Sequence, residues 1–264
     1  MARYPLQGDS LRVEVAEGIA TITLNRPSQH NALSRELRAN LLTALRALQD
    51  DEEVGVVILT GAGDKSFSVG ADLKEMQVAQ LGADELGPAA PMMQAFAALT
   101  KPTIAAINGF AITGGFELAI HCDILVASTR AQFADTHARV GLVSAWGLSQ
   151  YLRELIGPVR ARYLSFTGNY LDAATAKAWG LVLDVVPSEE LMPFCHRIAQ
   201  DILECDSATV RDLKRAIDGG LHGTLDEGLA LEGELARACL SRFDAGGFGE
   251  RRAMVMRRGK RQAT

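Results

Sequence analysis

The sequence predicts an α/β fold in which buried strands alternate with helices. The run Val54–Leu59 has no polar side chain, as expected for a strand that is covered on both faces. A second apolar run, Thr103–Ile107, follows later in the chain. Leucines recur at a helical spacing between residues 34 and 49, before the first run. Because strands alternate with helices, we expect parallel pairing and right-handed crossovers.

Turn signals and periodicity indicate the other elements of the first two thirds of the chain. Glu17-Gly18 predicts a tight turn between two short antiparallel strands, Val13–Glu17 and Ile19–Leu24. The leucine-rich helix begins at Ser34 and extends to about Gln49. Further elements are expected as a helix from about Leu73, a strand at Thr103–Asn108, a helix at Gly114–His121, a strand at Ile124–Ala127 and a short strand at Ala131–Phe133.

Beyond Pro187 the sequence predicts helices only. One apolar stripe runs from Leu191 to Ile202, and a second stripe is expected to end at Gly219-Gly220. Thr224 and Glu227 have the spacing of a capping box that begins a third helix. We therefore divide the chain into an α/β core over residues 1–190 and a helical region over residues 191–264, which packs against the core or a second subunit.

Composition and charge exclude several classes of protein. The chain has 264 residues, of which 48% are hydrophobic, so a well-buried core is expected. A net charge of −5 argues against a nucleic-acid partner, because such proteins usually carry a basic face. No apolar run approaches the length that spans a membrane. The four cysteines, Cys122, Cys195, Cys205 and Cys239, lack metal-site spacing, which predicts no metal and a reducing, cytoplasmic location.

Two glycine-centred loops are the main candidates for a functional site. Each follows an apolar strand and precedes a predicted helix; they are Phe67-Ser68-Val69-Gly70-Ala71-Asp72 and Thr113-Gly114-Gly115-Phe116-Glu117. Amides at a helix N-terminus have no intrahelical acceptor, so two such amides can hold a carbonyl oxygen that gains negative charge. Glu117 is a candidate for proton transfer. The alternative is that its carboxylate only complements the dipole of the helix.

These loops and their neighbours resemble the crotonase family of enoyl-CoA hydratases and isomerases. The resemblance is clear from about Thr21 to Pro187. The motifs that carry it are Leu24-Asn25-Arg26-Pro27, Asn31-Ala32-Leu33, Leu59-Thr60-Gly61, Phe67 to Met76, Ile107-Asn108-Gly109, Gly114 to Leu118, Leu164 to Gly168, Gly180-Leu181-Val182 and Val185-Val186-Pro187.

The resemblance implies a fold, a set of site residues and an assembly. The fold would be a spiral of strand-strand-helix units followed by helices that form a homotrimer or a dimer of trimers. Ala71 and Gly114 would supply the oxyanion hole for a thioester carbonyl, and Glu117 falls on one of two catalytic glutamates. The stretch Ala71, Asp72, Leu73 and Lys74 would run along coenzyme A, which is part of the acyl-CoA substrate, so no separate cofactor is expected. Residues 78–93 are expected to border the acyl pocket.

One departure from the family pattern concerns the second glutamate. That position lies four residues after Phe133, where this chain has His137. Imidazole can move protons near neutral pH, so His137 is a catalytic candidate, and the alternative is a polar residue that only lines the pocket. Asp135 is a further candidate, although two residues on a loop need not point in one direction. Ser144-Ala145-Trp146-Gly147 replaces a proline and a glycine-rich turn of the family.

The resulting hypothesis is an enoyl-CoA hydratase, a lyase that adds water reversibly to a 2-enoyl-CoA. Glu117 would be the principal acid/base and His137 would assist it. An isomerase that uses Glu117 alone remains an alternative, as does an acyl-CoA-binding protein with weak activity.

Overall fold

The computed structural model divides the chain into two compact units, residues 1–207 and residues 208–264. It describes residues 4–78, 87, 90–221, 223–243 and 245–262. Most of the segment that is expected to border the acyl pocket, residues 79–86 and 88–89, lies outside the described residues.

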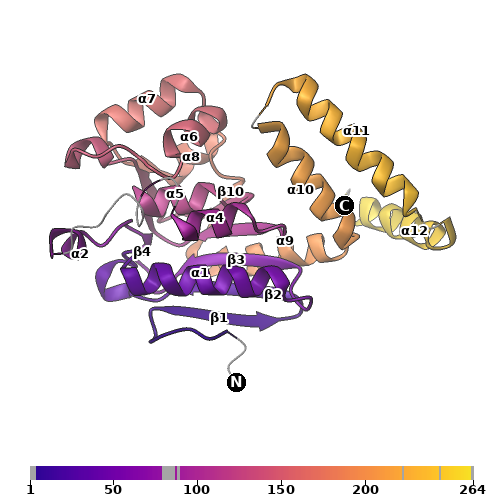
Figure 1. Ribbon diagram of the computed structural model, residues 1–264, viewed down its shortest axis with the longest axis horizontal. Helices are drawn as coiled ribbons and strands as arrows, with labels where there is room; N and C mark the ends of the chain where they lie inside the picture. Colours follow the sequence, from indigo (N-terminus) through magenta and orange to yellow (C-terminus); the bar gives the residue numbers. More distant parts are fainter. Residues whose placement is uncertain (1–3, 79–86, 88–89, 222, 244, 263–264) are drawn as a thin grey trace. The chain divides into compact units, whose positions relative to one another are not determined.

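A six-stranded sheet forms the scaffold of the first unit (Figure 1). Its first two strands are antiparallel, as predicted, and all later neighbours pair in parallel. In spatial order the strands are β1 (Leu11–Ala16), β2 (Ile19–Leu24), β3 (Val56–Gly61), β5 (Thr103–Ile107), β7 (Ile124–Ser128) and β10 (Asp184–Val186).

Helices cover both faces of this sheet, which explains why β3 is buried along its whole length. Leu59 contributes to a core that includes α1 (Arg35–Asp50), whereas Ile58 belongs to a second cluster with α9 (Leu191–Leu203). Successive side chains of a strand point to opposite faces, so α1 and α9 lie on opposite sides of the sheet (Figure 1). As predicted, α1 follows Ser34, whose hydroxyl accepts a hydrogen bond from the amide of Leu37.

The packing of α9 also bears on the proposed division at residue 190. This helix contacts β3, β5 and β7, and its buried residues Leu191, Cys195 and Ala199 complete the second apolar cluster. The first unit accordingly continues past residue 190 and ends after Ser207. The helices expected beyond Pro187 are present, but the first of them is part of the α/β unit.

A small second sheet was not predicted from the sequence. It consists of β4 (Ser66–Ser68), β6 (Phe110–Ile112), β8 (Gln132–Ala134) and β9 (Leu171–Asp172). The first three strands pair in parallel, so their carboxyl ends lie at one edge. The two glycine loops follow β4 and β6 directly and not β3 and β5, which corrects the predicted order of strand and loop.

Short helices complete the first unit. The helices predicted from Leu73 and from Gly114 are present. The helices not yet named are α2 (Leu73–Val78), α4 (Pro91–Ala97), α5 (Gly114–Ile120), α6 (Leu148–Ile156), α7 (Pro158–Thr167) and α8 (Ala173–Ala178), with single turns η1 (Pro27–Gln29), η2 (His137–Val140) and η3 (Ser188–Glu190).

The second unit is helical and contains α11 (Leu225–Ser241) and α12 (Ala245–Gln262), together with α10 (Ser207–Leu221), which begins at the boundary. The predicted capping box of Thr224 and Glu227 is present at the start of α11. The prediction that Gly219-Gly220 ends a helix is wrong, because α10 continues to Leu221. Gly219 instead permits close packing on α11, since a Cβ at this position would overlap Cδ2 of Leu231. No helix in the described part of the chain is long and apolar enough to cross a membrane.

Candidate active site

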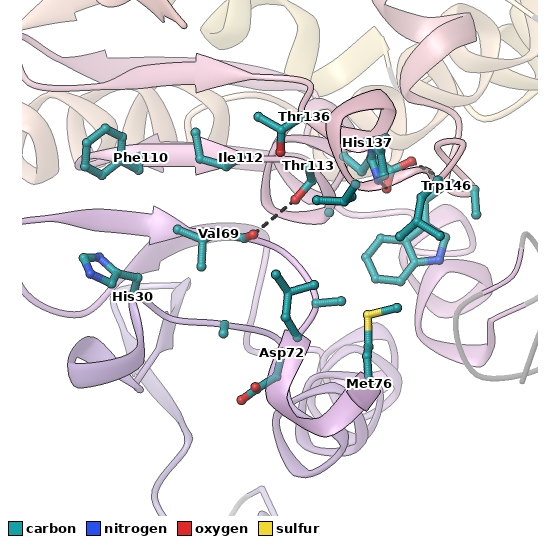
Figure 2. A pocket seen from close by; sticks show the side chains of 18 of the residues that line it. His30, Val69, Asp72, Met76, Phe110, Ile112, Thr113, Thr136, His137 and Trp146 are labelled. Atoms are coloured by element: carbon teal, nitrogen blue, oxygen red, sulfur yellow. Dashed lines mark hydrogen bonds and ion pairs between the residues drawn. The ribbon is translucent and has the colours of Figure 1, made fainter. Parts of the chain in front are cut away.

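A cavity of about 870 Å³ opens where the carboxyl ends of β4, β6 and β8 meet. Loops at this edge of a parallel sheet are the usual position of ligand sites in α/β folds. The cavity is lined by seven of the site residues that the sequence predicted, Ala71, Asp72, Leu73, Lys74, Gly114, Glu117 and His137, and the further candidate Asp135 is not among its lining residues. Figure 2 shows His137 and Trp146 at one wall and Asp72 and Met76 at another.

Two backbone amides at this edge are free to bind an anion. Among the described residues, neither the amide of Ala71 nor that of Gly114 donates to an acceptor. The bridge between Leu33 and Ala71 uses the amide of Leu33, which donates to the carbonyl of Gly70 at 2.8 Å. The amides are close together, because a Cβ on Gly114 would lie 3.6 Å from the nitrogen of Ala71.

Gly70 is required for this approach of the two loops. Its φ of +85° lies in the left-handed region, which disfavours any residue with a side chain. A Cβ at this position would also overlap the hydroxyl of Thr113 and lie 2.8 Å from the nitrogen of Gly114. The glycine therefore allows Ala71 and Gly114 to lie side by side.

Thr113 joins the two loops, and its own backbone is strained. Its φ of +47° is unusual for a β-branched residue and costs on the order of 1–3 kcal/mol. The hydroxyl donates to the carbonyl of Val69 at 3.1 Å, as Figure 2 shows, and the amide donates to Ala134 at the end of β8 at 2.9 Å. All three strand ends are thus tied together beside the free amides.

Glu117 lies on α5, one turn after the free amide of Gly114, and only 2% of its surface is exposed. Its Oε1 accepts a hydrogen bond of 2.7 Å from the amide of Trp146. Burial raises the pKa of this carboxyl, and the hydrogen bonds from the amides of Trp146 and Leu148 and the field of His137 only partly oppose this effect. A buried carboxyl with a raised pKa is suited to taking up and releasing a proton.

His137 faces Glu117 across the cavity wall. Its Nε2 lies 3.6 Å from Oε2 of Glu117, and its Nδ1 lies 2.7 Å from Oδ1 of Asp135. Burial lowers the pKa of the imidazole, but the hydrogen bond to Asp135 and the charges of Glu117 and Asp135 outweigh burial, so the pKa is raised. The structure thus places three titratable groups in one row, Asp135, His137 and Glu117.

The segment that contains Trp146 is held to α5 at two points. Besides the contact of its amide with Glu117, the carbonyl of Trp146 accepts a hydrogen bond of 2.6 Å from Nε2 of His121. His121 is one turn after Glu117, so the two side chains lie on the same face and bind the backbone amide and the backbone carbonyl of Trp146. The indole forms part of the cavity wall, and its ring lies 3.2 Å from the position of a Cβ on Gly114.

Asp72 uses its carboxylate within the protein. Oδ2 is paired with Arg26 at 2.9 Å, and Oδ1 accepts a hydrogen bond from the amide of Lys74 at 3.1 Å. Although burial opposes it, the pKa of Asp72 is lowered by Arg26 and by backbone amides at the start of α2. Leu73 and Lys74 are exposed at the cavity rim.

Comparison with known proteins identifies the family. A family model described as enoyl-CoA hydratase/isomerase matches residues 14–256. A protein from Arabidopsis thaliana named probable enoyl-CoA hydratase 1, peroxisomal, is 41% identical over 93% of this chain and 92% of its own length. The chain belongs to the enoyl-CoA hydratase/isomerase family, also called the crotonase family.

Two further relatives agree with this membership and with the predicted fold. A crotonyl-CoA hydratase from Syntrophomonas wolfei is 35% identical to this chain, and the match covers 89% of this chain and 92% of the relative. The crystal structure of an enoyl-CoA hydratase from Bacillus anthracis has a TM-score of 0.85 and 35% identity, covering 92% of this chain and 97% of that one. The prediction of a crotonase-like α/β fold is confirmed.

Sequence reasoning did not find two features of this site. It placed Asp135 in doubt, yet the Asp135 carboxylate accepts the amide of His137 at 3.3 Å as well as its ring nitrogen. Such a bond from residue i to i+2 is typical of aspartate in turns, so the Asp-Thr-His spacing was an available signal. The role of His121 was also missed, and its spacing of four residues from Glu117 was the corresponding signal. Within the described residues no cluster of His, Cys, Asp and Glu has the arrangement of a metal site.

Proposed function

We propose that this protein is an enoyl-CoA hydratase, which adds water reversibly across the C2–C3 double bond of a 2-enoyl-CoA. One observation carries the proposal: two amides without an acceptor lie in the same cavity as the facing pair Glu117 and His137. The names of the relatives from Arabidopsis and Syntrophomonas support the same reaction.

In this proposal the thioester carbonyl oxygen binds between the amides of Ala71 and Gly114. When water attacks C3, the electrons of the double bond move to the carbonyl, and the oxygen becomes negatively charged. Donors that are already fixed stabilise this charge without reorganisation, and loss of one such donor costs about 2.7–4 kcal/mol of barrier. The tie between Thr113 and Val69 holds these donors in place.

Glu117 and His137 divide the proton transfers. The 3.6 Å separation of their facing atoms lets one water lie about 2.8 Å from both, a normal hydrogen-bond distance. Glu117 takes a proton from this water as its oxygen bonds to C3, and His137 donates a proton to C2. The proton on Glu117 then returns to His137 for the next turnover. Both groups take part in hydration, whereas an isomerase needs only one base.

The stretch from Ala71 to Lys74 would follow coenzyme A, which enters as part of the substrate and not as a separate cofactor. Lys74 is exposed at the rim of the cavity, where its ammonium group is available to a phosphate of the coenzyme. Asp72, in contrast, would act through Arg26 by fixing the backbone next to Ala71.

Assembly and location complete the proposal. We expect a homotrimer or a dimer of trimers formed through the second unit, and exposed apolar residues on its helices, including Leu213, Ile217 and Leu229, support this expectation. A cytoplasmic location is supported by the four cysteines, all in the described part of the chain, none of which is in a disulfide. Light scattering of the purified protein and fractionation of cells test these two points.

Separate incubations with a 2-enoyl-CoA and a 3-enoyl-CoA, over a panel of chain lengths, test the reaction. The hydratase forms 3-hydroxyacyl-CoA from the 2-enoyl substrates. Conversion of the 3-enoyl substrates without any hydroxyacyl product would instead establish an isomerase. Tight binding of all esters with no turnover would establish a binding protein and overturn the proposal.

A further inference from the structure

Asp135 is buried directly after β8, and both hydrogen bonds of its Oδ1 are made with His137. Only 3% of its surface is exposed. Its Oδ1 accepts the amide of His137 at 3.3 Å and lies 2.7 Å from Nδ1 of the same residue. Ser165 of α7 contributes to the low pKa of this carboxyl. The two contacts of Oδ1 hold the carboxylate against the backbone and the ring of His137.

The chemistry of this contact determines how the imidazole carries its protons. Although burial opposes it, the hydrogen bonds from His137 and Ser165 lower the pKa of Asp135, which therefore remains an acceptor at neutral pH. Nδ1 of His137 must then carry a hydrogen, whether the ring is neutral or charged. The other ring nitrogen, Nε2, is left to exchange its proton with Glu117 and with the cavity.

We propose that Asp135 is a positioning residue for the acid/base pair: its contact with Nδ1 fixes the tautomer of His137, so that the ring presents Nε2 to Glu117 and to the substrate. This inference rests on the proposed hydratase function and extends it. Asp135 itself does not touch the reacting atoms. Its effect reaches the substrate only through the orientation and charge of the imidazole.

The groups that face His137 are few and determine its response to pH. α5 contributes Glu117, the turn after β8 contributes Asp135, and α7, which packs against η2, contributes the uncharged Ser165 to Asp135. Arg139 of η2 lies along Gly168. Within the active pH range Glu117 and His137 share one proton, and their titrations belong to the pair.

The variant Asp135→Asn distinguishes two roles for Asp135: an effect of its negative charge on His137, and structural support of the turn alone. The amide oxygen can still accept both bonds of Oδ1, but the negative charge is lost. We expect kcat for hydration to fall about 10- to 100-fold, as for the loss of a charge-assisted hydrogen bond. Both limbs of the pH profile should move to lower pH, the alkaline limb by about 1–3 pH units, because the protonated pair loses a nearby anion. Asp135→Ala removes the acceptor and should lower kcat further.

Asp123→Asn is the matched control. Asp123 also accepts a backbone amide, that of Thr103 at 2.7 Å, but it is not among the residues that line the cavity. The control should lose stability without any movement of the pH profile. If Asp135→Asn behaves like the control, with both limbs in place, then Asp135 is only structural and the inference is overturned.

Nitrogen-15 NMR of the His137 ring tests the inference without any turnover. At high pH we expect the neutral ring of the wild-type protein to carry its hydrogen on Nδ1, and the Asp135→Ala protein to lose this preference. A wild-type ring with its hydrogen on Nε2 would contradict the inference even if hydration is observed. The predicted tautomer in a protein that hydrates no 2-enoyl-CoA would instead contradict the proposed function alone.

Discussion

The two sheets of the first unit differ in the length of their strands and in the residues that follow them. β3 of the six-stranded sheet has 6 residues, all buried between α1 and α9, whereas β4 of the four-stranded sheet has only 3. The large sheet contributes side chains to both apolar clusters, one on each of its faces. The residues predicted to react or bind, by contrast, follow β4, β6 and β8 of the small sheet.

This difference shows how the fold separates stability from chemistry. Apolar side chains of the central strands of the large sheet pack in two clusters, one that includes α1 and one that includes α9. The small sheet needs only enough residues to fix the ends of its strands, and the tie through Thr113 completes that task. We therefore expect substitutions in the two sheets to have separable effects, and the following predictions test this separation.

The largest effect is expected from Glu117→Gln, at the edge of the small sheet. The amide oxygen can still accept the hydrogen bond from Trp146, but the group no longer accepts a proton. We expect kcat for hydration to fall about 10²- to 10⁴-fold, with acyl-CoA binding and thermal stability nearly unchanged. Steady-state kinetics and calorimetric binding check this result. Turnover at the wild-type rate would remove Glu117 from the mechanism.

Gly70→Ala is expected to disturb the two free amides. The added methyl group overlaps Thr113 and approaches the nitrogen of Gly114, so the loops must separate. We expect kcat to fall about 10²- to 10³-fold, as for the loss of an oxyanion donor. Gly63→Ala is the matched control, since Gly63 also has a positive φ of +80° but is not among the residues that line the cavity. Equal losses in both variants would show that backbone strain, and not the amides, is responsible.

Ile58→Ala tests the large sheet. Ile58 of β3 is fully buried in the apolar cluster that includes α9. Its truncation leaves a cavity, which should lower the free energy of unfolding by about 2–5 kcal/mol. The folded fraction should keep its kcat. Denaturant titration and kinetics on the same sample check both parts, with Ile58→Val as the milder control. A loss of kcat in fully folded protein would break the proposed separation of the sheets.

The smallest effect is expected from Lys74→Ala at the cavity rim. An exposed ion pair contributes about 0.2–1 kcal/mol, so the KM for acyl-CoA should rise by roughly twofold to fivefold with kcat unchanged. The increase should shrink as salt is added, because exposed charges are screened. A KM that does not depend on Lys74 at any salt concentration would leave the neighbouring backbone as the binding element.

The different lengths of the strands also explain what the sequence predicted and what it did not. Apolar runs of five or six residues, such as Val56–Gly61, have a pattern that stands out, and the leucine spacing of α1 is equally clear. Strands of three residues are too short for a clear period, so Ser66–Ser68 and Phe110–Ile112 were missed and only Gln132–Ala134 was predicted, one residue out of place. The glycines of α10 were misinterpreted because close helix packing depends on α11, which lies elsewhere in the chain.

For the site, local motifs were sufficient to predict which residues would gather but not how they would contact each other. Seven of the predicted residues line one cavity, yet the row of Asp135, His137 and Glu117 depends on side-chain directions that spacing alone does not determine. The contact of Trp146 with Glu117 likewise joins residues from separate elements.

The two hydrogen bonds that Glu117 and His121 make with the backbone of Trp146 have a consequence for substrate choice. Glu117 holds the amide of this residue and His121 holds its carbonyl, while its indole forms part of the cavity wall. An acyl group that shifts the backbone of Trp146 must therefore displace the carboxylate of Glu117 as well. Such a group can still bind, but it is out of alignment with its base, so the enzyme rejects a poorly fitting substrate by slow turnover and not by weak affinity.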